Sequence, residues 1–366
     1  MSDVRGETDP GRSDHWSALA SSAPFYCGAD WLRFADSDGL ATSHYLTLDG
    51  EAALSAHHTP AEVNGGYLPG RQLSGAGEEL ALTLGGRRGY LSAPLLAGDD
   101  PAPLTELVRA AVKTPPLTRG RWWWPYLTGP DAALVLRATG PWRPRAHLLG
   151  ADCVLPVPEG GLDGYLAALP AKQRRTNVRR ELRRYRDSGL RTVSGRLSEW
   201  AEVCGPMLSR TQRKYGHDHS PELMTDLLRR QARYLDDRSV VFVSLDEDDH
   251  PVGFCLAYAH GPTLWVRVVG FDYARLRDAD EYAELAVHSP LRHCQRWGMT
   301  QLHLGTGSYQ AKCRRGARLR PLWAVSALGE PESTPALEVD APGREQALLA
   351  EAIETDRRLL EGTREW

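Results

Sequence analysis

Apolar and polar residues alternate less clearly in the first part of the chain than in the second. Residues 24–150 contain strand-like runs such as SHYLTL and AALSAHH, helix-like stretches, and glycine-rich segments such as NGG and LGGRRG. Alternation with a period of two is typical of half-buried strands, and glycine-rich segments are typical of turns. This part is predicted to be a mixed α/β region. Its tryptophan run, RWWWPYL, could stack a ligand, but we favour a core position.

The second half has a sharper pattern. DCVLPVP, residues 152–158, alternates like a strand. A helix is predicted at residues 170–188, because Pro170 suits a first helical turn and Gly189 can end the helix. Residues 191–330 then predict the order β-α-α-β-β-β-α-β-α-β, in which the three consecutive strands are joined by short turns and are expected to be antiparallel.

The length of 366 residues exceeds what one hydrophobic core usually organises, so two domains or one enlarged domain is expected. Residues 1–22 are polar and are predicted to be a disordered leader. We place an N-terminal domain at residues 23–150 and a C-terminal domain at residues 151–330. Residues 331–366 are predicted to form a linker and a C-terminal helix.

The composition limits the kind of protein. With 42% hydrophobic and 25% charged residues, the chain is typical of a globular protein. Neither a membrane span nor the apolar centre of a signal peptide is visible, so a cytoplasmic location is expected. The six cysteines stand far apart without a CxxC pair, which argues against a disulfide framework and a zinc ribbon. Two close histidine pairs lack further ligands, so no metal site is expected.

Positive charge gathers on the helix predicted at residues 170–188. The net charge of the chain is −3, but at helical spacing one face of this helix carries a stripe of cations, and Glu181 is the single carboxylate among them. The stripe consists of Lys172, Arg175, Arg179, Arg183 and Arg186. Such a face binds phosphates whatever the nucleotide sequence, so we expect it to bind RNA or another polyanion. The alternative is a solvated helix in an arginine-rich protein.

The segment LHLGTGSYQAKCRRGARLRPLW, residues 302–323, combines glycines with a short predicted helix. Gly305 and Gly307 let the backbone come close to a ligand, and Ser308 is expected to cap the helix. Tyr309 and Lys312 are three residues apart and so share one face of that helix. An oxyanion or a phosphate near the lysine would be stabilised electrostatically.

These patterns resemble the Fem-like branch of the GNAT acyltransferase superfamily, whose members often carry two GNAT-type domains in tandem, and are similar to the seryl transferase of the valanimycin pathway. The resemblance rests on YLAALPAKQRRTNVRRELRRYRDSGL, on RVVGFDY and on residues 302–323. It implies an α/β (α+β) fold of tandem GNAT-like domains, with a mixed, mostly antiparallel sheet flanked by helices. The copy at residues 23–150 would be degenerate, and the catalytic copy would lie at residues 151–330.

The resemblance implies acyl transfer but leaves the donor open. GNAT enzymes usually seat the pyrophosphate of coenzyme A on backbone amides at a glycine-containing helix start, where the helix dipole favours an anion. Here that place has no glycine between Gly270 and Gly298, and it carries Asp278, Asp280 and Glu281. Because carboxylates would repel a pyrophosphate, we expect the donor of Fem-like enzymes, an aminoacyl-tRNA.

Acyl transfer needs positioning, proton removal and stabilisation of an oxyanion. Lys312 and Tyr309 are the candidates for stabilisation, and the candidates for the base are Asp272 and either Glu281 or Glu284. A structural alternative is that Lys312 pairs with Asp272 or Glu281 and only holds its helix. The residues expected to bind the donor are Gly305, Gly307, Ser308 and Arg315.

We therefore expect an acyltransferase that moves an acyl, and preferentially an aminoacyl, group from tRNA to a small amine, hydroxylamine or hydroxyl acceptor in antibiotic or other natural-product biosynthesis. No cofactor is expected beyond aminoacyl-tRNA as co-substrate. One alternative is an N-acyltransferase that uses a coenzyme A thioester. Another is a non-catalytic RNA-binding module. The oligomeric state is not predicted.

Overall fold

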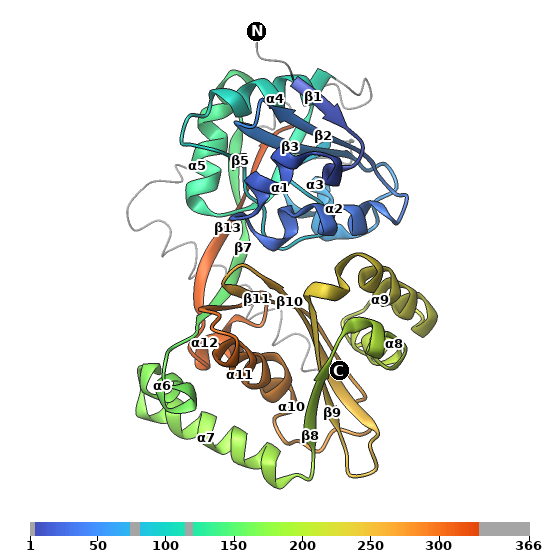
Figure 1. Cartoon of the computed structure of the whole chain (residues 1–366), viewed down its shortest axis with the longest axis vertical. Helices are drawn as coiled ribbons and strands as arrows, with labels where there is room; N and C mark the ends of the chain where they lie inside the picture. Colours follow the sequence, from blue (N-terminus) through green and yellow to red (C-terminus); the bar gives the residue numbers. More distant parts are fainter. Residues whose placement is uncertain (1–3, 74–80, 114–119, 329–366) are drawn as a thin grey trace. The chain divides into compact units, whose positions relative to one another are not determined.

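The computed structural model describes residues 4–73, 81–113 and 120–328, which form two compact units (Figure 1). The first unit comprises Met1–Ala151 and Arg320–Trp366, and the second comprises Asp152–Leu319. The linker and C-terminal helix predicted at residues 331–366 lie outside the described residues.

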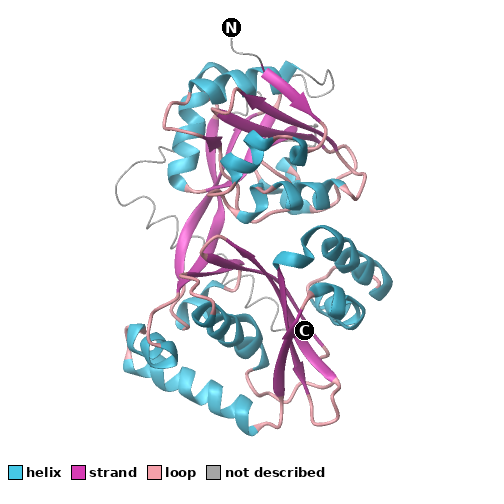
Figure 2. Ribbon diagram, in the orientation of Figure 1, coloured by secondary structure: helices cyan, strands magenta, loops and turns pink. Residues whose placement is uncertain are grey.

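Helices and strands are mixed in both units, which confirms the predicted α/β class (Figure 2). The strands form one mixed sheet of 13 strands in the order β1-β2-β3-β4-β6-β13-β7-β12-β11-β10-β9-β8, with β5 paired to β3 off this path. The bounds of the strands before β8 are β1 (Val4–Glu7), β2 (Thr42–Leu48), β3 (Ala52–His58), β4 (Leu82–Leu84), β5 (Leu95–Leu96), β6 (Trp122–Leu127) and β7 (Arg145–Pro156). The later ones are β8 (Arg191–Gly195), β9 (Ser239–Leu245), β10 (Pro251–His260), β11 (Thr263–Phe271), β12 (Gln301–Thr306) and β13 (Arg318–Ala327).

The first unit is built on short helices around its strands. They are η1 (Pro10–Arg12), α1 (Asp14–Ala20), η2 (Phe25–Cys27), α2 (Ala29–Asp36), η3 (Gly65–Tyr67), α3 (Pro69–Gln72), α4 (Ala102–Lys113), α5 (Gly129–Ala138) and η5 (Gly140–Trp142). Leucines of α4 pack with Trp122 and Trp124 of β6 and with Trp323 of β13 in one core cluster. All three tryptophans of β6 are buried, which confirms that the RWWWPYL run belongs to the core.

The prediction of a disordered leader at residues 1–22 is wrong for the part that the structure describes. β1 pairs with β2, and α1 begins after Ser13, whose side chain accepts a bond from the Trp16 amide. Trp16 is 1% exposed, and its indole nitrogen donates to the Cys27 carbonyl at 3.1 Å. A single buried tryptophan thus holds a polar segment that composition alone marks as disordered.

The second unit follows the predicted order of elements from residue 191 onward. Its helices are α6 (Gly161–Ala168), α7 (Lys172–Asp187), α8 (Leu197–Lys214), α9 (Pro221–Leu235), η6 (Asp236–Arg238), α10 (Glu281–Ala283), the π-helix η7 (Glu284–His288), α11 (Ser289–Arg296) and α12 (Tyr309–Arg314). α8 and α9 lie on one face of this unit's strands, and α10 and α11 lie on the other (Figure 1). The helix predicted at residues 170–188 is α7, which begins two residues after Pro170.

The strands form two similar series, and the last strand of each series pairs with a strand of the other series. Each repeat has a parallel pair, β4 with β6 and β11 with β12. The strand antiparallel to β6 is β13, from the end of the described chain, and the strand antiparallel to β12 is β7, which follows the first repeat. This order supports an internal duplication.

Candidate active site

The parallel strands β11 and β12 part from each other inside the second unit. They pair at only three positions, ending with Trp265 opposite His303. β11 then runs on to Phe271 beside β10, and β12 runs on to Thr306 beside β7. Beyond Trp265 and His303, no pairing joins the facing edges of β11 and β12 among the residues that the structure describes. Such edges can bind an extended ligand that contains amides.

Each of the two strands has a bulge where the separation starts. On β11 the register with β10 shifts so that Arg267 is the extra residue, and on β12 the register with β7 shifts so that Leu304 is the extra one. A bulge bends its strand and increases the local twist, and bulges are frequent beside active sites. The two bulges therefore explain why β11 and β12 diverge at this point.

A buried acid–imidazole pair lies at the closed end of the gap. Asp152 Oδ2 is 2.9 Å from His303 Nε2, and both side chains are at most 2% exposed. The Trp265 ring lies 4.3 Å from the His303 ring, centroid to centroid. Sequence reasoning missed this group. Its only signal was a charged residue at the start of the apolar strand DCVLPVP.

The loop after β12 has an unusual backbone, as its glycines predicted. Gly305 and Gly307 have φ of +69° and +70°, and Ser308 has φ of 51°. The expected side-chain cap is wrong, because the Ser308 side chain accepts no bond from the first turn of α12. A left-handed residue does not have the extended backbone of an ordinary N-cap. The Ser308 carbonyl instead accepts a bond from the Lys312 amide at 3.2 Å.

Lys312 is buried inside this loop, at 6% exposure. Its ammonium donates to the carbonyl of Gly305 at 3.2 Å and to that of Thr306 at 2.8 Å. Neither Asp272 nor Glu281 pairs with it among the described residues, so the alternative of such an ion pair is wrong. The lysine holds the turn between β12 and α12 closed, and it brings a positive charge to the end of the parting strand.

Two of the predicted bases, Asp272 and Glu281, have other partners. Asp272 Oδ2 is 2.9 Å from Arg210 Nη1 of α8. Glu281 is 5% exposed, and its two oxygens accept bonds from the amides of Arg277 at 2.6 Å and Ala279 at 2.9 Å. Glu281 thus shapes the loop before α10, and the structure does not bring it to Lys312 as a base.

Arg315 does not lie open as an anion site. Its Nη2 and Nε are 2.9 and 3.0 Å from the two carboxylate oxygens of Glu181, and His288 Nε2 is 3.1 Å from the same Glu181 Oε2. Burial raises the pKa of Glu181, but the hydrogen bond from His288 and the positive charge of Arg315 outweigh burial and lower it. The expected donor-binding role of Arg315 is therefore corrected to an ion pair that joins α12 to α7.

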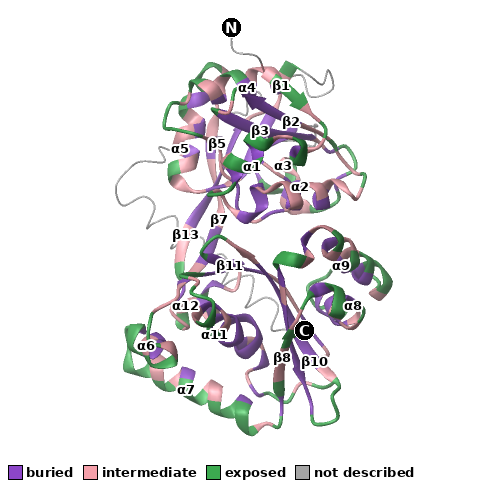
Figure 3. Cartoon of the chain, in the orientation of Figure 1, coloured by how far each residue is buried: buried purple, intermediate pink, exposed green. Residues whose placement is uncertain are grey.

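The outer face of α7 remains charged and exposed (Figure 3). Among the described residues, no ion pair neutralises the exposed cations Lys172, Arg179, Arg180 and Arg183. Two members of the predicted stripe differ. Arg175 is half-buried and donates to the Leu169 carbonyl at 2.7 Å, and Arg186 pairs with Asp187 at 2.9 Å. The inner face buries Val178 and Tyr185, as the pattern predicted.

The tip between β9 and β10 brings three possible metal ligands together, Asp246, Asp248 and His250. Asp246 Oδ1 accepts the amides of the other two at 3.1 and 2.9 Å. These bonds stabilise the turn between β9 and β10, and the turn explains why the three side chains lie close together.

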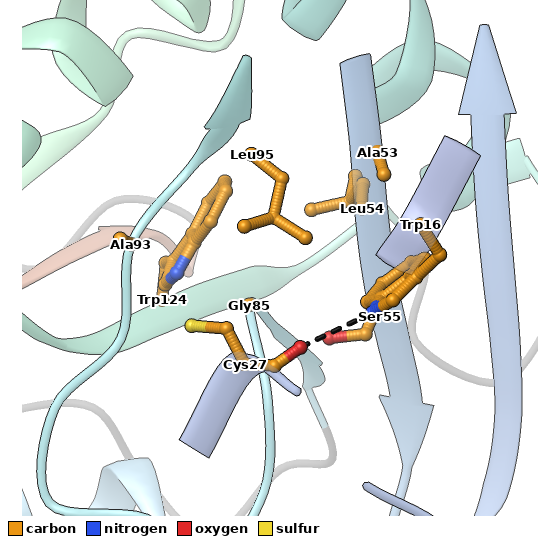
Figure 4. A pocket seen from close by; sticks show the side chains of 9 residues that line it. All are labelled: Trp16, Cys27, Ala53, Leu54, Ser55, Gly85, Ala93, Leu95 and Trp124. Atoms are coloured by element: carbon orange, nitrogen blue, oxygen red, sulfur yellow. Dashed lines mark hydrogen bonds between the residues drawn. The ribbon is translucent and has the colours of Figure 1, made fainter. Parts of the chain in front are cut away.

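The first unit has a small pocket of mostly apolar lining (Figure 4). Trp16, Leu54, Leu95 and Trp124 line it, together with the thiol of Cys27. Burial raises the pKa of Cys27 to about 12, so the thiol stays protonated and inert. The pocket therefore belongs to the core of the first unit.

Comparisons with known proteins agree with this architecture. Residues 172–312 match the family described as Acetyltransferase (GNAT) domain. No curated protein matches the sequence. The parting strands and this family match both indicate the class of GNAT acyltransferase folds.

Solved structures extend the likeness over most of the chain. FemX has a TM-score of 0.60 at 9% identity, covering 88% of this chain and 96% of that one. L-PGS from Bacillus licheniformis has a TM-score of 0.55 at 14% identity, covering 89% and 94%. A tandem GNAT protein from the clavulanic acid biosynthesis pathway has a TM-score of 0.52 at 11% identity, covering 91% and 100%. The chain thus has a tandem GNAT fold, as predicted.

No helix in the described part of the chain combines the length and apolar character that crossing a membrane requires.

Proposed function

We propose that the protein is an acyltransferase that moves an aminoacyl group from tRNA to a small amine, hydroxylamine or hydroxyl acceptor in natural-product biosynthesis. The observation that carries the proposal is the outer face of α7, where the exposed cations Lys172, Arg179, Arg180 and Arg183 have no ion-pair partner in the described part of the chain. A face of this kind binds a phosphate backbone with an affinity that falls steeply with salt. Arginine suits such a face, because one guanidinium group can bind two oxygens of a phosphate at the same time.

The acidic start of the helix after β11 supports the same donor. Asp278 and Asp280 both have positive φ, and Glu281 occupies the amides of Arg277 and Ala279. Backbone amides that a carboxylate already binds are not available to a pyrophosphate. Two amides of the loop that leads into α10, next to the place where GNAT enzymes usually seat coenzyme A, are therefore already bound by the chain itself.

In the proposed reaction, the acceptor attacks the carbonyl of the aminoacyl ester in the gap between β11 and β12. A bond forms from the carbonyl carbon to the nitrogen or oxygen of the acceptor, the bond from that carbon to the ribose oxygen breaks, and the proton that the acceptor loses ends on the ribose hydroxyl. The ammonium of Lys312, fixed by two carbonyl groups, stabilises negative charge that develops nearby. Tyr309, 7% exposed, lies three residues before Lys312 on the same short helix, and Gly305 and Gly307 let the backbone approach the ester.

A second candidate is an N-acyltransferase that uses a coenzyme A thioester. The separation of β11 from β12 favours it, because the pantetheine arm contains amides that could bind to the backbone between two parting strands. The similar tandem GNAT protein from the clavulanic acid biosynthesis pathway was solved without AcCoA, so AcCoA is the molecule named in connection with that protein.

The test is an assay of a panel of radiolabelled aminoacyl-tRNAs, with cell extract as the source of acceptor. We expect acceptor-dependent deacylation that RNase abolishes. Turnover of acetyl-CoA that survives RNase would establish the second candidate. RNA retention without loss of the acyl group would mean a binding module.

Charge reversal on α7 tests the RNA surface directly. We expect Arg179→Glu/Arg183→Glu to raise the KM for charged tRNA and to flatten the slope of log affinity against log salt by roughly 2, because two phosphate contacts are lost. The matched control is Arg213→Glu/Arg233→Glu, which removes as much charge from the exposed surface of α8 and α9. Equal effects of both pairs on KM would remove α7 from the proposal.

A further inference from the structure

The carboxylate of Glu181 points away from the charged face of its own helix. Its side chain is 15% exposed, and Arg315, 13% exposed, binds both of its oxygens. His288, 3% exposed, comes from the π-helix η7 and shares one of these oxygens. π-helices are rare in proteins, and those that do occur are often found at functional sites. Three elements that lie far apart in the sequence therefore meet at one carboxylate.

Arg315 in turn fixes the backbone of Lys312. The Arg315 amide donates to the Lys312 carbonyl at 3.0 Å, and its Nη1 donates to the Ala311 carbonyl at 2.9 Å. The Arg315 carbonyl accepts the hydroxyl of Tyr165 from α6 at 2.8 Å. A shift of the Arg315 side chain would therefore move the last turn of α12, which carries Lys312.

Glu181 and the exposed cations Arg179 and Arg183 lie on opposite faces of one helical turn, because residues two apart do not share a face. A polyanion bound to the outer face of α7 and the Glu181–Arg315 ion pair on its inner face therefore act on the same turn of the helix. A second bond, from Arg174 Nη1 to the Cys313 carbonyl at 3.0 Å, joins the same two helices.

We infer that Glu181 is a positioning residue that couples α7 to the Lys312 loop. A polyanion that binds to α7 would then alter the position of residues 305–316. The identity of the polyanion rests on the proposed function. The role of Glu181 in holding the loop does not.

Hydrogen exchange tests the holding role without any substrate. In Glu181→Gln, which keeps the shape and removes the charge, we expect the amides of Lys312 and Arg315 to exchange about tenfold faster than in the wild type. The matched control is Glu202→Gln, which breaks the exposed pair with Arg229 at 2.6 Å and should leave these amides unchanged. Unchanged exchange in Glu181→Gln would overturn the inference.

Kinetics with charged tRNA tests the coupling. Glu181→Gln should lower kcat about tenfold while the KM for tRNA stays within about twofold, because the outer face of α7 is intact. Exchanging the charges in Glu181→Arg/Arg315→Glu should recover part of kcat. A raised KM with unchanged kcat would contradict the coupling. A wild type that consumes no charged tRNA would defeat the proposed function, and the exchange experiment would still decide the role of Glu181.

Discussion

At the scale of single residues, the partners of Glu181 change the free energy of its ionisation. The hydrogen bond from His288 and the charge of Arg315 outweigh burial, so the folded protein lowers the pKa of this carboxyl. A carboxylate with a lowered pKa stabilises the fold above its unfolded pKa of about 4.3, and this contribution is lost as the pH falls through the folded value. The stabilisation is therefore complete at neutral pH.

We accordingly expect the wild type to exceed Glu181→Gln in free energy of unfolding at pH 7, and the difference to shrink as the pH falls from about 5 to about 3. Denaturant unfolding at a series of pH values measures this. Glu202→Gln should differ little from the wild type at neutral pH, because exposed ion pairs contribute little. A difference for Glu181→Gln that is independent of pH would contradict the ion pair.

The residue scale also shows how far the sequence could predict the site. The glycines, Lys312 and its short helix were recognisable, because their spacing is local. Their partners were not. The ion pair of Arg315 joins residues 134 positions apart, and the pair of Asp152 with His303 spans 151 positions. Which cation a carboxylate meets depends on the packing of whole elements, which spacing does not encode.

At the scale of elements, Gly270 lets α8 approach β11. A Cβ atom at this position would lie 2.8 Å from the Leu208 amide nitrogen and 2.9 Å from the Met207 carbonyl carbon. Both contacts are with the backbone of α8, which cannot rotate away as a side chain can. Only glycine at position 270 therefore lets α8 pack this closely against β11, the strand that borders the gap.

We expect Gly270→Ala to lower the free energy of unfolding by about 1–3 kcal/mol, because overpacking forces the helix to shift. Denaturant unfolding and the thermal midpoint measure this loss. Gly140→Ala is the control, since a Cβ atom there would meet nothing within 4 Å. A neutral Gly270→Ala would show that α8 can move without cost.

At the scale of the whole molecule, the first unit depends on a strand from the other end of the described sequence. β13 pairs with β6, with Trp323 opposite Leu127, and Trp323 is 1% exposed in the core of the first unit. The residues of β13 from Arg320 onward accordingly belong to the first unit, although the whole second unit separates them from it in sequence.

Trp323→Ala should therefore destabilise the first unit by about 3–5 kcal/mol, because it leaves a cavity in that core. Hydrogen exchange should accelerate in α4, α5 and β6, with little change in α8 and α9. The exposed Trp297 supplies the control, and Trp297→Ala should cost about 0.5 kcal/mol or less. Acceleration confined to the second unit would contradict the assignment of β13.

The sequence by itself determined the α/β class, the order of elements after residue 191 and the charged face of α7, because periodicity and turn chemistry are local properties. The tertiary structure alone decided that β11 and β12 part, that the closing strands are exchanged and that Glu181 faces Arg315. These features depend on the register between strands and on contacts between distant segments, and the energies of such contacts arise only once the chain is packed.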